Sequence, residues 1–226
     1  MNIKNIFLLV FILSSSIYAQ QNREQALNKG GWSGGLAGWV GWENYNTTLN
    51  LGQTSDAAKV DGFNFIFSSR NGSIVENNGV FGFDFQWRER SRTITPDPSP
   101  DNRSEAINEK VWFLGLWARY YIPFGGNFAV FFEGSGGYAV YSQKNETITD
   151  LEFAYYNNEA YANGFAYNGG IGVSHFVSTN AAFELTGRYE GGSLNGENEN
   201  YSGAKNDLNV KLKNIFILFG FQIYLR

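Results

Sequence analysis

The chain has 226 residues, a formal net charge of −4 and no cysteine, and 17% of its residues are aromatic. The lack of cysteine excludes disulfide bonds, thiolate metal sites and acylation on cysteine. The mild acidity argues against nucleic acid as a partner. The aromatic share and the 27 glycines are high for an ordinary soluble domain, whereas aromatic girdles and glycine-rich strands would account for both.

The N-terminus has the pattern of a secretory signal peptide. Lys4 precedes an apolar stretch from Ile6 to Leu13, and a cleavage site follows Ala19. The stretch is too short for a membrane-spanning helix, which needs about 20 residues, and no other stretch comes closer. We therefore expect a signal peptide at 1–19, a short periplasmic lead at 20–30, and a barrel at 31–226 as the only way to reside in a membrane.

Alternation of apolar with small or polar residues recurs from Trp32 to the end of the chain, which is typical of β-strands. Eight strands are predicted, at about 31–43, 60–69, 79–90, 111–122, 128–142, 164–176, 181–190 and 208–225.

The clearest alternation lies in the third predicted strand. There Phe81, Phe83, Phe85 and Trp87 alternate with Gly82, Asp84, Gln86 and Arg88. A charged row opposite four aromatics does not fit a soluble core strand, but it fits a strand with lipid on one side and a polar interior on the other. The last strand starts in the opposite phase, which predicts either a bulge near Asn214 or an extension beyond the membrane.

The connections fall into two length classes. Three are short, at 70–78, 123–127 and 177–180, and four are long and polar, at 44–59, 91–110, 143–163 and 191–207. This arrangement predicts an all-β fold, an eight-stranded antiparallel up-and-down transmembrane β-barrel. We expect it in the bacterial outer membrane, in contact with outer-membrane lipids, with its loops extracellular and its termini periplasmic. A soluble lipocalin-like barrel or sandwich is the alternative fold.

The chain also resembles a known family. The segments that carry the resemblance are 114–123 (LGLWARYYIP), 169–176 (GGIGVSHF) and the aromatic closing strand. They are similar to the small eight-stranded outer-membrane β-barrel proteins of the OmpX and OmpA-transmembrane type, in the version common in Bacteroidetes-like bacteria. The resemblance implies one scaffold used for adhesion, envelope support and accessory roles.

The inward rows of the predicted barrel carry charges. An eight-stranded barrel is only wide enough to be filled by side chains, so these charges should neutralise one another. Pairing Ile122 with Phe128 would place Arg119 diagonally across from Glu133. We therefore expect an interior polar network, with a narrow gated pore as the alternative. Its predicted members are Asp84, Arg88, Arg119, Glu133, Glu184 and Arg188.

The single histidine raises the alternative of a lipid-modifying enzyme. Ser174 precedes His175 and must point to the opposite face of its strand, and Glu184 is predicted on the inward row. We therefore expect His175 to lie at the headgroup level, and the protein to be non-enzymatic, with no cofactor or metal.

Tyrosines gather in or beside the predicted long loops. Tyrosine is enriched at protein interfaces, which predicts a structural or interaction role through the extracellular loops, including that of an accessory subunit bound to a protein partner in an outer-membrane complex. The contact residues this suggests are Tyr45, Tyr155, Tyr156, Tyr161 and Tyr201.

Overall fold

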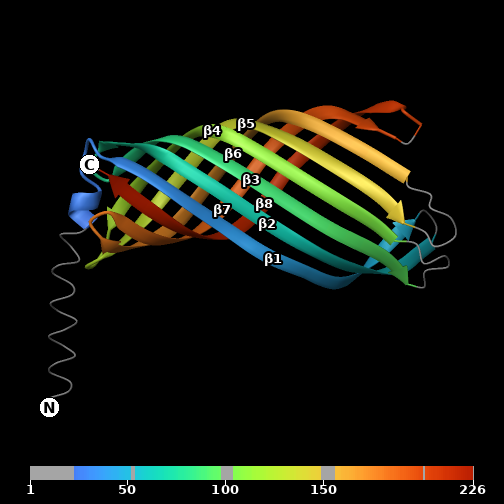
Figure 1. Cartoon of the computed structure of the whole chain (residues 1–226), viewed down its shortest axis with the longest axis horizontal. Helices are drawn as coiled ribbons and strands as arrows, with labels where there is room; N and C mark the ends of the chain where they lie inside the picture. The colour runs from blue at the N-terminus through green and yellow to red at the C-terminus, as the bar shows by residue number, and fades with distance from the viewer. Residues whose placement is uncertain (1–22, 52–53, 98–103, 149–155, 201, 226) are drawn as a thin grey trace, which may run out of the picture.

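The computed structural model describes residues 23–51, 54–97, 104–148, 156–200 and 202–225. Eight strands close into a barrel, and each pairs antiparallel with its neighbours in the chain (Figure 1). The predicted eight-stranded antiparallel up-and-down barrel is confirmed. The strands are β1 (Trp32–Leu51), β2 (Thr54–Glu76), β3 (Gly79–Asp97), β4 (Ser104–Pro123), β5 (Phe128–Ile148), β6 (Tyr156–Ser178), β7 (Ala181–Glu199) and β8 (Lys205–Leu225).

The strands are much longer than the sequence predicted. They have 19 to 23 residues, whereas about 9–11 suffice to cross a bilayer. The four predicted long loops at 44–59, 91–110, 143–163 and 191–207 were wrong, because most of each is the paired end of two strands. The predicted strand ends were placed where the lipid-facing apolar residues end, at the membrane surface. The backbone pairing between strands continues beyond that surface.

One predicted short turn was also wrong. β2 continues through Arg70 to Glu76, so the β2–β3 connection is only Asn77 and Asn78, and Asn78 has a positive φ of 69°. Asparagine tolerates this left-handed backbone better than most residues. We call the end of the barrel with the connections 77–78, 124–127 and 179–180 the turn end, and the opposite end the loop end.

The phase change in β8 is not a bulge. β7 and β8 pair without a register shift, so the bulge predicted as one alternative near Asn214 is absent. Leu208, Val210 and Leu212 point inward, and Lys211 and Lys213 are exposed outward. The same face of β8 points inward along its whole length, but at the loop end the inward residues are apolar and the outward residues are polar. This supports the other alternative, an extension of the strand beyond the membrane.

The outward-facing side chains form an apolar band, which ends abruptly toward the loop end. At its loop end Trp87 stacks on Trp112, with ring centroids 5.4 Å apart and an interplanar angle of 9°. The next outward residues on these two strands are Glu89 and Lys110. Aromatic girdles mark the boundary between lipid and water in membrane barrels, so roughly half of each strand lies beyond the band. In the described part of the chain, no helix is long and apolar enough to cross a membrane.

The turn end of the interior is closed by an apolar layer. Residues 23–26 form one helical turn at this end (Figure 1), and Leu27, 1% exposed, packs inside the strands. Arg23 Nη1 donates a hydrogen bond of 3.0 Å to the carbonyl oxygen of Gly126. The described part of the region predicted as a short periplasmic lead therefore contributes Ala26 and Leu27 to this layer. The layer consists of Ala26, Leu27, Ile74, Val80, Trp117, Tyr121, Ala129, Phe131, Phe176, Ala182 and Tyr224.

A second apolar layer fills the loop half of the interior. The inward rows of β4, β5, β6, β7 and β8 contribute side chains to it. Its buried members are Val111, Phe113, Ala139, Tyr141, Ala162, Ala166, Leu194 and Leu212. Charged residues of the interior lie among these apolar side chains: on β4 Arg119 stands between Tyr121 and Trp117, and Arg88 on β3 pairs with Val111.

The junction of β1 with β8, which we call the seam, is paired over only part of its length. Pairing runs from Trp32 and Leu225 to Gly38 and Phe219, which is seven residue pairs. β1 pairs with β2 over 20 residues. In the described residues, the loop-end parts of β1 and β8 therefore each have one unpaired edge, and Figure 1 shows the β7–β8 hairpin standing apart at that end.

Candidate functional site

Two features qualify as functional sites, the charged interior and the seam. In the interior, Glu133 is held by two arginines. Its carboxylate accepts hydrogen bonds from Arg70 Nη1 at 2.6 Å and from Arg119 Nη2 at 2.7 Å, and from the Trp117 indole at 3.2 Å. Glu133 lies directly opposite Arg119 in the β4–β5 ladder. All four side chains are buried.

The predicted β4–β5 register was wrong by two residues. Ile122 lies opposite Val130 rather than Phe128, which moves Arg119 from a diagonal position to one directly across from Glu133. The prediction ended β4 one residue early, at Ile122, because it treated Pro123 as part of the connection. The structure continues β4 to Pro123 and leaves 124–127 as the turn.

Glu184 is the second acceptor at this level. It accepts hydrogen bonds from Arg119 Nη1 at 2.6 Å and from the Ser174 hydroxyl at 2.9 Å, and Arg70 Nη2 lies 3.8 Å away. The Tyr121 hydroxyl donates to the same carboxylate at 3.3 Å. Arg70 and Arg119 thus bridge two carboxylates from β5 and β7, and the four charges form one unit.

A second set of charges lies nearer the loop end. Arg188 forms an ion pair with Asp84, which also accepts hydrogen bonds from Ser68 and Ser135 at 3.2 and 2.8 Å. Above it, Arg88 pairs with Glu190. The Asn214 amide donates to that carboxylate at 2.7 Å.

The structure places all six predicted interior residues in the barrel and adds two more, Arg70 and Glu190. The eight are four arginines against four carboxylates, and every carboxylate is ion-paired. Arg70 was missed because its position was assigned to a turn. The alternation of Ile66, Ser68 and Arg70, all buried, was the signal that could have found it.

The arrangement around His175 separates the elements of a hydrolase site. Ser174 points inward and bonds Glu184, whereas His175 points outward and stacks on Phe128, with ring centroids 4.6 Å apart. The wall of the barrel lies between them. Among the described residues, no group of three or more His, Asp or Glu side chains could hold a metal ion.

The predicted loop tyrosines are only partly described. Tyr161 is 58% exposed on the outer wall and donates a hydrogen bond of 3.2 Å to Glu159. Tyr45 and Tyr156 belong to β1 and β6 by their backbones. Tyr155 and Tyr201 lie outside the described residues.

The seam is flanked by the most exposed large apolar side chains of the described chain. Ile215 on β8 is 80% exposed and Trp42 on β1 is 78% exposed. Both follow the last pair, Gly38 with Phe219, on the loop side. Trp39 stacks on Phe219 at 6.4 Å, at the point where the strands separate. Trp42 and Ile215 belong to the apolar band, so part of the unpaired backbone lies at the depth of the lipid.

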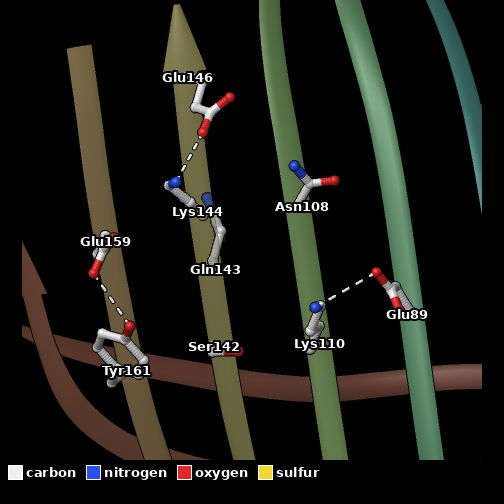
Figure 2. A pocket seen from close by; sticks show the side chains of 9 residues that line it. All are labelled: Glu89, Asn108, Lys110, Ser142, Gln143, Lys144, Glu146, Glu159 and Tyr161. Carbon is white, nitrogen blue, oxygen red and sulfur yellow. Dashed lines mark hydrogen bonds and ion pairs between the residues drawn. The ribbon is translucent and has the colours of Figure 1, made fainter. Parts of the chain in front are cut away.

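The outer wall beyond the band carries a polar collar, which Figure 2 shows on β3 to β6. Each lysine there has an acidic partner: Lys110 Nζ lies 3.7 Å from Glu89, and Lys144 Nζ lies 2.9 Å from Glu146. The hydrogen bond to Glu146 raises the pKa of Lys144. The two lysines of this part of the collar are thus neutralised by neighbouring carboxylates.

Comparison with known proteins finds no matching family model and no matching curated protein. Solved structures of outer-membrane proteins are similar. OprG from Pseudomonas aeruginosa is 15% identical, with a TM-score of 0.48, over 89% of this chain and 99% of its own. The protease OmpT from Escherichia coli is 11% identical, with a TM-score of 0.48, over 87% and 94%. Ail of Yersinia pestis is 14% identical, with a TM-score of 0.38, over 87% and 99%. These chains differ in activity, and the likeness is at most one of fold.

Proposed function

We propose that this protein is a non-enzymatic barrel of the bacterial outer membrane that binds a partner protein, as an accessory subunit of an outer-membrane complex. In this proposal the loop end is extracellular, the termini are periplasmic, and the partner contacts the loop half of the barrel. The partner's main contact is the seam, in addition to the loops that the sequence predicted.

The open seam is the observation that carries the proposal. Unpaired N–H and C=O groups are costly in hydrocarbon, because no water is available to bond them. Exposed strand edges are also templates for pairing with another chain. An extended segment of a partner would satisfy both edges and cover Trp42 and Ile215.

Site-specific photo-crosslinking tests the proposal. A photoreactive phenylalanine analogue at Trp42 or Ile215 should trap one protein of defined mass in native outer membranes. The same analogue at Phe83, which is 60% exposed on the closed wall, is the matched control and should trap none. Equal trapping at Phe83, or none at the seam in a barrel shown to be folded by heat-modifiable gel migration, would contradict the proposal.

The filled interior supports a binding role over a pore. Two apolar layers lie there with four arginines and four carboxylates that neutralise one another, and an eight-stranded barrel has no spare width. The separation of His175 from Ser174 and Glu184 by the wall likewise supports a role without catalysis, because a general base must reach the group it activates.

A further inference from the structure

A groove of about 410 Å³ lies on the outer wall across β6, β7 and β8, where the apolar band ends. Its floor is aromatic: Tyr167 and Tyr189 have ring centroids 6.3 Å apart. A Cβ at Gly191 would lie only 2.5 Å from Cζ of Tyr167, so this ring lies flat against bare backbone. The missing side chain leaves room for the Tyr167 ring, which lines the groove.

Two lysines, Lys211 and Lys213 on β8, also line this groove. Across the strands, Tyr167 pairs with Gly191 and Gly191 with Lys213. One step further from the band, Phe165 pairs with Ser193 and Ser193 with Lys211. Two parallel rows thus each run from an aromatic through a small residue to a lysine. The two lysines are two residues apart on one strand, so their Cα atoms lie roughly 7 Å apart.

These lysines differ from the others of the loop-end wall in having no partner. Within the described residues, Lys59, Lys110, Lys144 and Lys205 each form an ion pair with a carboxylate, at 3.0, 3.7, 2.9 and 3.0 Å. Neither Lys211 nor Lys213 has an ion pair or a side-chain hydrogen bond there. Their cross-strand neighbours Ser193 and Gly191 are uncharged, so the positive charge is left available to a ligand.

We propose that Lys211 and Lys213 bind the phosphate of a phosphorylated glycolipid of the outer leaflet, with an acyl chain in the aromatic groove below. Ammonium groups bind phosphate as point charges, and the aromatic floor lies on the band side, where the acyl chains of a bound lipid would lie. The assignment rests on the proposed orientation, with the loop end outside the cell. Lysines also protect exposed strand edges from aggregation, a role that would need no lipid.

Native mass spectrometry of the purified barrel with added bisphosphorylated lipid A tests this site. The double variant Lys211→Gln, Lys213→Gln should bind at least about tenfold more weakly, since each lysine contributes about 1 kcal/mol at an anionic surface. The matched control Lys110→Gln, Lys144→Gln removes the same charge from the same collar, at the pairs in Figure 2, and should bind like the unaltered protein. Binding to the unaltered protein should also weaken as salt rises.

Three results would overturn the assignment. They are equal losses in both double variants, equal binding of dephosphorylated lipid A, and equal binding of phosphatidylglycerol. An edge-protecting role predicts aggregation of the lysine variant without a change in lipid preference, which also contradicts a lipid site. Photo-crosslinking at Trp42 in the same variant separates the two proposals. If the crosslinks are retained and lipid binding is lost, the proposal of partner binding is unaffected. If the crosslinks are lost and lipid binding is retained, the proposal of the lipid groove is unaffected.

Discussion

At the scale of single residues, the charged side chains of the interior share ion-pair partners and do not form separate pairs. Arg119 contacts both Glu133 and Glu184, and Glu133 is also held by Arg70. Removing one charge therefore leaves a partner that is only partly compensated, in a place from which water is excluded. Breaking a buried ion pair typically costs about 3–5 kcal/mol.

A double-mutant cycle tests this sharing. We expect Arg119→Met and Glu133→Gln each to destabilise the barrel, and the double variant to lose less than the sum, with a coupling of about 0.5–3 kcal/mol. Urea unfolding in lipid vesicles, followed by tryptophan fluorescence, measures it. The surface pair Glu89→Gln, Lys110→Met is the control and should change stability by less than about 1 kcal/mol. Additive losses of stability in the buried pair would show that Arg119 and Glu133 are not coupled.

Leu27 carries a second prediction at this scale. Its side chain is 1% exposed in the apolar layer at the turn end, so Leu27→Ala should cost about 2–5 kcal/mol. The neighbouring Lys29→Ala, at an exposed position, should stay within about 0.5 kcal/mol. The temperature at which gel migration changes from folded to unfolded compares the two. Equal shifts would mean that the N-terminal turn does not contribute to the core.

At the scale of elements, the sequence predicted which strands exist but not where they end. The alternation of Phe81, Phe83, Phe85 and Trp87 opposite polar residues was sufficient to identify β3 and its inward face. Beyond the band the outward row becomes polar, as at Glu89, and no single-face pattern then distinguishes a strand from a loop. Arg70 was missed because its position was assigned to a turn, and the partial pairing of β1 with β8 leaves no local trace in either strand.

Disulfide trapping measures the seam directly. Leu36 lies opposite Phe221 in the paired part, and the same register, if continued, would bring Val40 opposite Ile217. We expect Leu36→Cys with Phe221→Cys to crosslink on oxidation, because paired Cα atoms lie about 4.5–5.5 Å apart. Val40→Cys with Ile217→Cys should stay reduced in the purified barrel. Equal crosslinking of both pairs would show a closed seam.

At the scale of the whole molecule, buried side chains obstruct the interior in both halves of the barrel. The apolar layer at the turn end and the apolar layer of the loop half both place buried side chains in the lumen, and eight ion-paired side chains lie there as well. An ion would meet two apolar barriers. The loop half of the barrel also has its own cluster of buried apolar side chains.

Planar-bilayer recording tests the blocked interior. The folded barrel should give no steady conductance, under conditions in which an open porin gives clear steps. Arg188→Ala should also stay silent, because both apolar layers remain intact. Steady, reproducible steps from the unaltered barrel would favour the gated-pore alternative.

The short pairing of β1 with β8 also determines how the barrel fails under mechanical load. Seven residue pairs join these strands, whereas 19 join β7 to β8. A lateral pull within the membrane would therefore tear the wall along this one line, beside both chain ends, and unroll the cylinder into a flat ribbon of hairpins.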